Sequence, residues 1–200
     1  MELDDWAEDT ARTMLQVPLP RRWAHTQAVA VQALTLKPIL GKDTDLLVAA
    51  AWLHDIGYAP DLVDTGFHPL DGARYLGDTS QADELLCRLV AHHSCAVIEA
   101  AQRGLDRTLL SEFAPIDGEL ADALTYCDMT TGPDGQRMSV EQRLEEISSR
   151  YALDHPVSRT LAYTAPELTC AVRRVQRRLA RASSARNVLP AVRPPVLAAT

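Results

Sequence analysis

The chain has 200 residues, of which 46% are hydrophobic, and a formal net charge of −7 at pH 7. These values fit one globular domain with an ordinary core, and the negative charge argues against general binding to nucleic acid. The acidic N-terminus lacks the apolar stretch of a signal peptide, and no apolar run reaches the roughly 18 residues of a membrane helix. We therefore expect a cytoplasmic protein, monomeric or homodimeric, whose cysteines are reduced thiols.

Helical periodicity dominates the first part of the chain. Residues 2–15 predict a short acidic helix, which Pro18 and Pro20 end. Residues 21–36 predict a second helix, because their apolar side chains recur with a helical rather than an alternating period. His25 lies in the first two turns of this helix.

A stretch that is apolar on every side, residues 46–53, follows and predicts the most deeply buried helix of the domain. The polar residues 43–45 are expected to cap its N-terminus. His54 and Asp55 stand at its C-terminal end, and Gly57 is expected to stop the helix in a left-handed conformation. A buried carboxylate is costly unless it is paired or bound to a metal, so this helix end predicts a partner for Asp55.

The second half of the chain also predicts helices. The first begins at His68, with Pro69 in its first turn, and further helices cover 81–93, 119–129 and 139–151. The last of these opens with a capping-box-like start, Ser139 followed by Gln142. A short helix follows Pro156, and a final helix covers 165–182. Residues 103–118 contain glycines and a proline and predict an irregular segment. The proline-rich tail, residues 183–200, is expected to be extended or disordered. Since no segment alternates as a strand does, the predicted class is all-α, with one domain over residues 1–182.

Histidines and aspartates recur on several of these predicted helices. His25 lies on an early helix, the pair His54 and Asp55 ends the central one, and Asp128 lies on the inner face of a later one. Imidazoles and carboxylates that converge inside a helical bundle make up a metal site. The alternative interpretation of the same residues is a hydrogen-bonded network in the core.

This order of residues resembles the HD-domain superfamily of metal-dependent phosphohydrolases. The family pattern is a His on one helix, an adjacent His-Asp pair at the end of a second helix, and a distant Asp. The chain matches it with His25, the tetrapeptide His-Asp-Ile-Gly at 54–57, and Asp128, and the resemblance covers most of residues 21–180. It implies an HD-domain helical bundle with a central metal site, in which His54 and Asp55 are catalytic.

The resemblance also implies a second metal ion, which some members bind through two further histidines. His68 and His92 occupy that place in the chain, and Asp55 would bridge the two ions. Because His92 and His93 point about 100° apart on a helix, we expect only one of them to be a ligand. The resemblance favours His92, since family members usually use the first of such a pair. The implied cofactor is one or two divalent ions (Fe, Mn, Co, Ni, Zn or Mg), with the ligands His25, His54, Asp55, His68, His92 and Asp128.

The function that the resemblance implies is hydrolysis of a phosphate ester by metal-activated water. The partner would be a small phosphorylated molecule, such as a nucleotide or another metabolite. Arg21 and Arg22, one helical turn before His25, and Tyr58, just after the motif, are the candidate substrate-binding residues. Two alternatives remain at this point: a di-iron oxygenase of the same fold, and a metal-binding sensor without catalysis.

Overall fold

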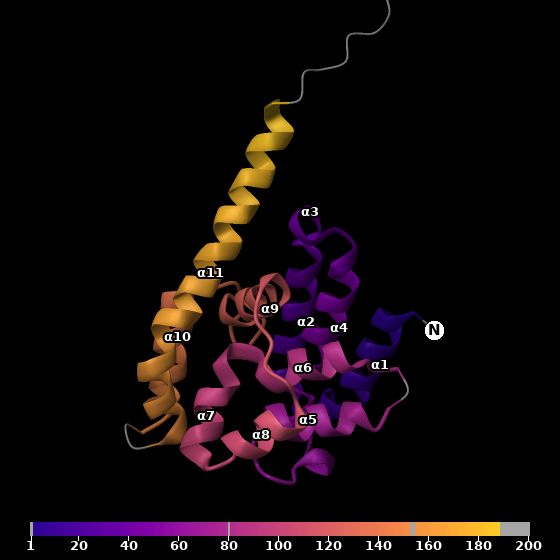
Figure 1. Cartoon of the computed structure of the whole chain (residues 1–200), viewed down its shortest axis with the longest axis vertical. Helices are drawn as coiled ribbons and strands as arrows, with labels where there is room; N and C mark the ends of the chain where they lie inside the picture. The colour runs from indigo at the N-terminus through magenta and orange to yellow at the C-terminus, as the bar shows by residue number, and fades with distance from the viewer. Residues whose placement is uncertain (1, 80, 153–154, 189–200) are drawn as a thin grey trace, which may run out of the picture.

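The computed structural model describes residues 2–79, 81–152 and 155–188, which form helices joined by turns (Figure 1). The α-helices are α1 (Leu3–Leu15), α2 (Pro20–Leu34), α3 (Lys37–Leu40), α4 (Thr44–Leu53), α5 (His68–Gly77), α6 (Glu84–His92), α7 (Ala96–Arg103), α8 (Asp106–Glu112), α9 (Glu119–Met129), α10 (Val140–Arg150) and α11 (Pro156–Val188). Short 3-10 turns are η1 (Gly41–Asp43), η2 (Ile56–Tyr58), η3 (Pro60–Leu62) and η4 (His93–Cys95). Within the described ranges the β pairing is a single isolated bridge, so the predicted all-α class is confirmed.

Helix α4 is the centre of the fold, as its uniformly apolar sequence predicts. It packs against α1, α2, α6 and α9, and Leu47 and Leu53 are fully buried. The predicted capping is not observed: the Asp43 side chain makes no cap hydrogen bond, and Thr44 Oγ1 instead donates to the Gly41 carbonyl at 2.8 Å. Burial on all sides, rather than capping, therefore holds this helix in place.

Gly57 serves a close contact between two segments. Its φ is not positive, so the predicted left-handed stop is wrong. A Cβ at this position would lie 2.1 Å from the carbonyl oxygen of His68 and 2.6 Å from the amide nitrogen of Gly72. The missing side chain lets η2 lie directly against the start of α5, which brings His68 next to the end of α4.

The C-terminal half differs from the prediction in two places. Residues 106–112 form α8 inside the segment predicted to be irregular. Helix α11 continues through Pro166, where two separate helices are predicted, and extends to Val188 beyond the body of the domain (Figure 1). Packing along α7, α9 and α10 outweighs the hydrogen bond that Pro166 removes. Residues 183–188 are thus helical, and the rest of the predicted tail, 189–200, lies outside the described residues.

Two further features bear on the expectations from the sequence. Helix α10 begins with the predicted capping box: the Ser139 hydroxyl accepts from the Gln142 amide, and the Gln142 side chain accepts from the Ser139 amide.

In the part of the chain that the structure describes, no helix combines the length and the apolar character needed to cross a bilayer.

Candidate metal centre

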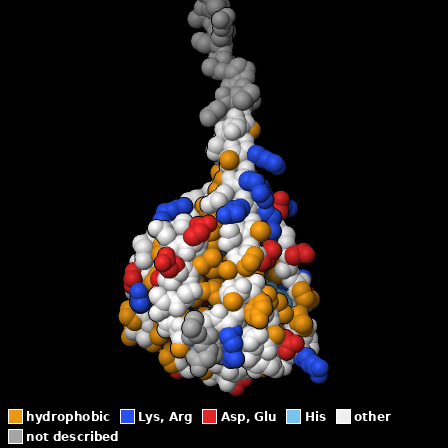
Figure 2. All heavy atoms as spheres, turned by 90° about the vertical axis from the view of Figure 1, so that its left-hand side faces the viewer, with side chains coloured by type: hydrophobic (Ala, Val, Ile, Leu, Met, Phe, Trp, Pro, Cys, Tyr) orange, Lys and Arg blue, Asp and Glu red, His pale blue; other side chains and the backbone are white. Residues whose placement is uncertain are grey.

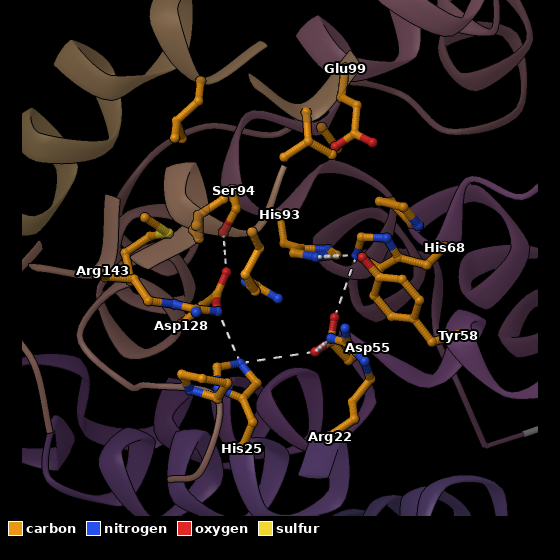
Figure 3. A pocket seen from close by; sticks show the side chains of 18 of the residues that line it. Arg22, His25, Asp55, Tyr58, His68, His93, Ser94, Glu99, Asp128 and Arg143 are labelled. Carbon is orange, nitrogen blue, oxygen red and sulfur yellow. Dashed lines mark hydrogen bonds and ion pairs between the residues drawn. The ribbon is translucent and has the colours of Figure 1, made fainter. Parts of the chain in front are cut away.

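Six side chains from five elements converge in two groups of three that each have the spacing of metal ligands, and all but the buried His54 line a pocket (Figure 3). The first group comprises His25, His54 and Asp128, and the second comprises Asp55, His68 and His93. Within each group, one ligand atom per residue lies within 4.8 Å of the others. Helices α2, α5 and α9, the end of α4, and η4 supply these residues.

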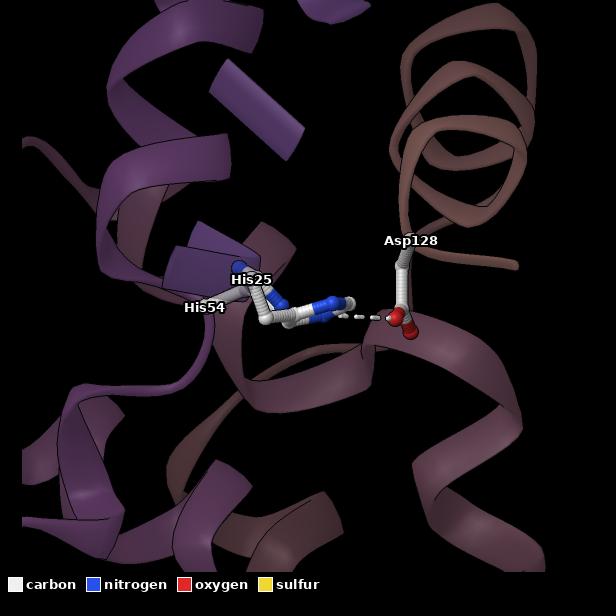
Figure 4. A group of neighbouring side chains, drawn as sticks. All are labelled: His25, His54 and Asp128. Atoms are coloured by element: carbon white, nitrogen blue, oxygen red, sulfur yellow. Dashed lines mark ion pairs between the residues drawn. The ribbon is translucent and has the colours of Figure 1, made fainter. Parts of the chain in front are cut away.

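The first group presents two imidazole nitrogens that have no hydrogen-bond partner among the described residues (Figure 4). His25 Nδ1 is bonded to the Gly132 carbonyl at 3.0 Å, and His54 Nδ1 to the Ala51 carbonyl at 2.8 Å. Because a carbonyl oxygen accepts a hydrogen bond, each Nδ1 is the donor, and in the neutral imidazole each Nε2 keeps its lone pair. His25 Nε2 lies 3.3 Å from Asp128 Oδ1. Buried lone pairs aimed at a carboxylate fit a cation, because they otherwise remain unsatisfied.

In the second group, a backbone carbonyl likewise fixes the tautomer of a histidine. His93 Nδ1 is bonded to the Val90 carbonyl at 2.7 Å, so its Nε2 also keeps the lone pair. His93 Nε2 and His68 Nε2 are 3.2 Å apart. Their neighbour Asp55 completes the group, with Oδ1 at 3.4 Å from His68 Nε2.

Asp55 lies between the two groups. Its Oδ2 is 3.5 Å from His54 Nε2 and 3.9 Å from His25 Nε2, while its Oδ1 faces His68. The two oxygens of one carboxylate therefore point at different sets of imidazoles. This placement fits a carboxylate shared by two cations.

The expectation for His92 is wrong. Its Nε2 is bonded to the Phe113 carbonyl at 2.9 Å, away from the two groups, and His93 takes the place predicted for it. The prediction assumed that the helix continues through both histidines, but α6 ends at His92. Ser94 and Cys95 then adopt positive φ values of 50° and 62°, and this turn directs His93 inward. Neither residue type signals a left-handed turn in the sequence.

Charge and burial set the protonation of the centre. Burial lowers the pKa of His54 and lowers that of His68 well below the usual value, so both imidazoles are neutral at pH 7 and available as ligands. Burial raises the pKa of Asp55, but the Arg22 guanidinium and the imidazoles of His54, His68 and His25 together outweigh it and hold that pKa well below its usual range. The pKa of Asp128 is likewise lowered, against the effect of burial, by His25 and His54.

The three predicted substrate-binding residues all line the pocket, which has a volume of about 430 Å³. Arg22 is ion-paired with Asp55, and its guanidinium lies 3.6 Å from the centroid of the Tyr58 ring. The Tyr58 ring is in turn stacked on His68, with 3.9 Å between centroids. Arg21 lies at the exposed rim and is paired with Asp134 at 2.7 Å.

The sequence reasoning missed two residues of the pocket. Ser94 donates a hydrogen bond to Asp128, and Arg143 of α10 is buried with Nη2 at 3.9 Å from Asp128 Oδ1. Arg143 follows a capping box on a helix with many charged residues, so its sequence context predicts a solvated side chain. Helix α10 packs against α9 and α11, and this arrangement of distant segments, which the sequence does not indicate, leaves Arg143 buried.

The comparison with protein families agrees with this geometry. Residues 22–144 match the family model described as HD domain; the match runs from α2 into the first turn of α10 and includes all six convergent side chains. No curated protein and no solved structure shows significant similarity to the chain. With the helical fold and the His/Asp groups in place, the chain belongs to the HD-domain superfamily, whose members are in general metal-dependent phosphohydrolases.

Proposed function

We propose that this protein is a hydrolase that uses divalent metal to cleave the phosphate ester of a small phosphorylated molecule. The observation that carries the proposal is the position of Asp55 between two sets of imidazoles. Two ions that share a carboxylate can bind a phosphate and the attacking oxygen together. The proposed ligands are His25, His54, Asp55, His68, His93 and Asp128.

The residues around the two groups prepare them for this chemistry. The carbonyls of Gly132 and Ala51 fix the tautomers of His25 and His54, so that both present Nε2. Asp55 and Asp128 remain ionised because their pKa values lie below the usual range. When bound, divalent metal supplies hydroxide at neutral pH by lowering the pKa of its water to about 7.

Two arginines flank the groups and are suited to bind phosphoryl oxygens. Figure 3 places Arg22 near Asp55 and Arg143 near Asp128, on opposite sides of the pocket floor. Planar guanidinium groups bind phosphate through paired hydrogen bonds. Tyr58, which lies against Arg22, would hold that guanidinium in position, and Arg21 would meet the substrate at the rim.

The test is phosphate release from a panel of phosphorylated molecules by protein loaded with Mn²⁺, Co²⁺ or Fe²⁺. We expect release that depends on the metal and that disappears in Asp55→Ala, while circular dichroism shows that this variant stays helical. Substrate-dependent oxygen uptake without phosphate release would instead identify an oxygenase. Metal binding with no turnover in either assay would identify a sensor and contradict the proposal.

A further inference from the structure

The wall of the pocket opposite the His/Asp groups has a different character from its floor. Helices α10 and α11 build this wall, which we call the apolar wall and define by its members Ile147, Tyr151, Val157, Thr160, Leu161, Thr164 and Leu168. Every member lies after residue 144, where the match to the HD-domain model ends. The part of the chain that the family model covers thus supplies the floor, and a separate part supplies the wall.

The apolar wall is continuous with the core on one side and open to the pocket on the other. Leu168 is buried, whereas Ile147 and Leu161 are partly buried and pack on the core. Figure 2 looks at the face that carries α10 and α11, and apolar side chains gather there below the protruding end of α11. Leu19 and Pro18 line the same pocket from the loop before α2. A molecule held above the metal ligands therefore meets hydrocarbon on two sides.

The arginines that line the pocket do not make the apolar wall polar, because each of them already has a carboxylate partner. Arg21 is paired with Asp134, Arg22 with Asp55, and both Arg143 and Arg150 with Glu146. Arg22 and Arg143 lie beside Asp55 and Asp128 at the floor, where the phosphate would be held, and not at the apolar wall. A highly charged organic group that extends to the apolar wall would thus meet hydrocarbon there and lose its hydration.

One buried hydroxyl of the apolar wall lacks a hydrogen-bond partner in the described part of the chain, whereas that of Thr164 donates to the Thr160 carbonyl. The hydroxyl of Thr160 is buried and has no hydrogen-bond partner among the described residues. Leaving a buried hydroxyl without a partner costs about 1–3 kcal/mol. A bound molecule with a single polar group at its edge could supply the missing partner.

We propose that the apolar wall selects the substrate, and that the substrate is a phosphate monoester whose organic part is an apolar ring or chain. The inference rests on the proposed function for the position of the phosphate, which would lie at the His/Asp groups. The organic part extends toward Ile147 and Leu161. Polar esters of similar size, such as glycerol phosphate, would bind less tightly because they bury no hydrocarbon there.

Binding to two phosphonates, one with an apolar ring and one with a short diol as its organic part, tests this inference without turnover. We would measure, by calorimetry on metal-loaded protein, the affinities for 3-phenylpropylphosphonate and for 3,4-dihydroxybutylphosphonate. We expect the phenyl compound to bind at least about tenfold more tightly, because an apolar pocket gives discrimination of this size for even a single methylene. Equal affinities, or tighter binding of the diol, would overturn the inference.

Substitutions in the apolar wall test its role directly, and a substitution outside the pocket is the matched control. Leu161→Asn should remove most of the preference for the phenyl compound and leave the affinity for the diol unchanged. Tyr163→Asn, on the same helix but 71% exposed and outside the pocket, should keep the preference. Ile147→Asn repeats the test from α10 if Leu161→Asn does not fold. A retained preference in a folded wall variant would also overturn the inference.

Failure of this inference and failure of the proposed function are distinguishable. If the protein hydrolyses phosphate esters but shows no preference between the two phosphonates, the proposed function is supported and the inference about the apolar wall is contradicted. A clear preference in a protein that releases no phosphate from 2-phenylethyl phosphate would support the wall as a binding surface and contradict the hydrolase.

Discussion

The Ser94 hydroxyl donates a hydrogen bond to Asp128 Oδ2 at 2.5 Å, while the other oxygen of Asp128 faces His25 (Figure 3). Ser94 makes this contact from a left-handed conformation, which is uncommon for a residue other than glycine. The same turn directs His93 into the second group. One strained segment, η4, thus positions a residue of each group, and strain of this kind tends to occur at functional sites.

The first prediction concerns this contact. Replacing Ser94 by Ala should weaken metal binding by about ten- to a hundredfold, the usual effect of removing a group that orients a ligand. Competition with a chelator measures the affinity. Ser111→Ala is the control, because that hydroxyl donates to a backbone carbonyl on the exposed side of α8. Equal affinities of Ser94→Ala and the wild type would show that Asp128 needs no support.

The second prediction concerns the approach of η2 to α5. Gly57→Ala would place a Cβ against backbone atoms of His68 and Gly72, so α5 must move away. We expect a lower melting temperature together with weaker metal binding, because His68 moves with the helix. Gly77→Ala, in the same helix with open space around the new Cβ, should be neutral or slightly stabilising. Similar melting temperatures for the two variants would contradict this account.

The outcome for the sequence predictions has a physical pattern. The central helix and the capping box of α10 follow from local residue types, and the structure confirms both. The choice between His92 and His93 depends on the left-handed turn at Ser94 and Cys95, which has no local signature. Arg143 and the continuous α11 depend on packing between distant parts of the chain. Tertiary contacts decided these features, and a single sequence does not record them.

The third prediction concerns the response of the metal-free protein to acid. His54 and His68 have folded pKa values below the usual 6.5, and Asp55 and Asp128 have values below the usual 3.8. In both cases the unfolded chain binds more protons than the folded one, so the free energy of unfolding decreases as the pH falls. Protonation of the histidines lowers the free energy of unfolding as the pH falls below 6.5. Protonation of the aspartates lowers it further as the pH falls below 3.8.

Urea denaturation in the presence of a chelator, over a series from about pH 8 to about pH 4, measures this dependence. We expect a plateau above the usual histidine pKa and a steady decrease below it. A free energy of unfolding that stays constant or rises as the histidine range is crossed would contradict the assignment of neutral, buried imidazoles.

The fourth prediction separates the two neighbouring arginines. Arg22 forms an ion pair with Asp55, the carboxylate that faces both sets of imidazoles, whereas Arg21 forms an ion pair with Asp134 at the surface. Arg22→Gln should lower kcat/KM for a phosphate ester by about 10²-fold, as expected when a charge-stabilising donor is lost. It should also tighten metal binding, because a competing cation leaves Asp55.

Arg21→Gln serves as the control for this substitution. Its exposed ion pair contributes little to stability, and its guanidinium lies farther toward the rim, so we expect a small change in kcat/KM. Steady-state kinetics and the chelator competition assay report the two effects separately. Weaker metal binding in Arg22→Gln would show that Arg22 supports the metal site and does not compete with it.

The central claim is that His25, His54, Asp55, His68, His93 and Asp128 form one metal centre, with His93 rather than His92 as a member. The most direct measurement is the metal content of anaerobically purified protein, compared between His93→Ala and His92→Ala. The account predicts that His93→Ala loses bound metal and that His92→Ala retains the wild-type content. Full metal content in His93→Ala, or an equal loss in both variants, would contradict it.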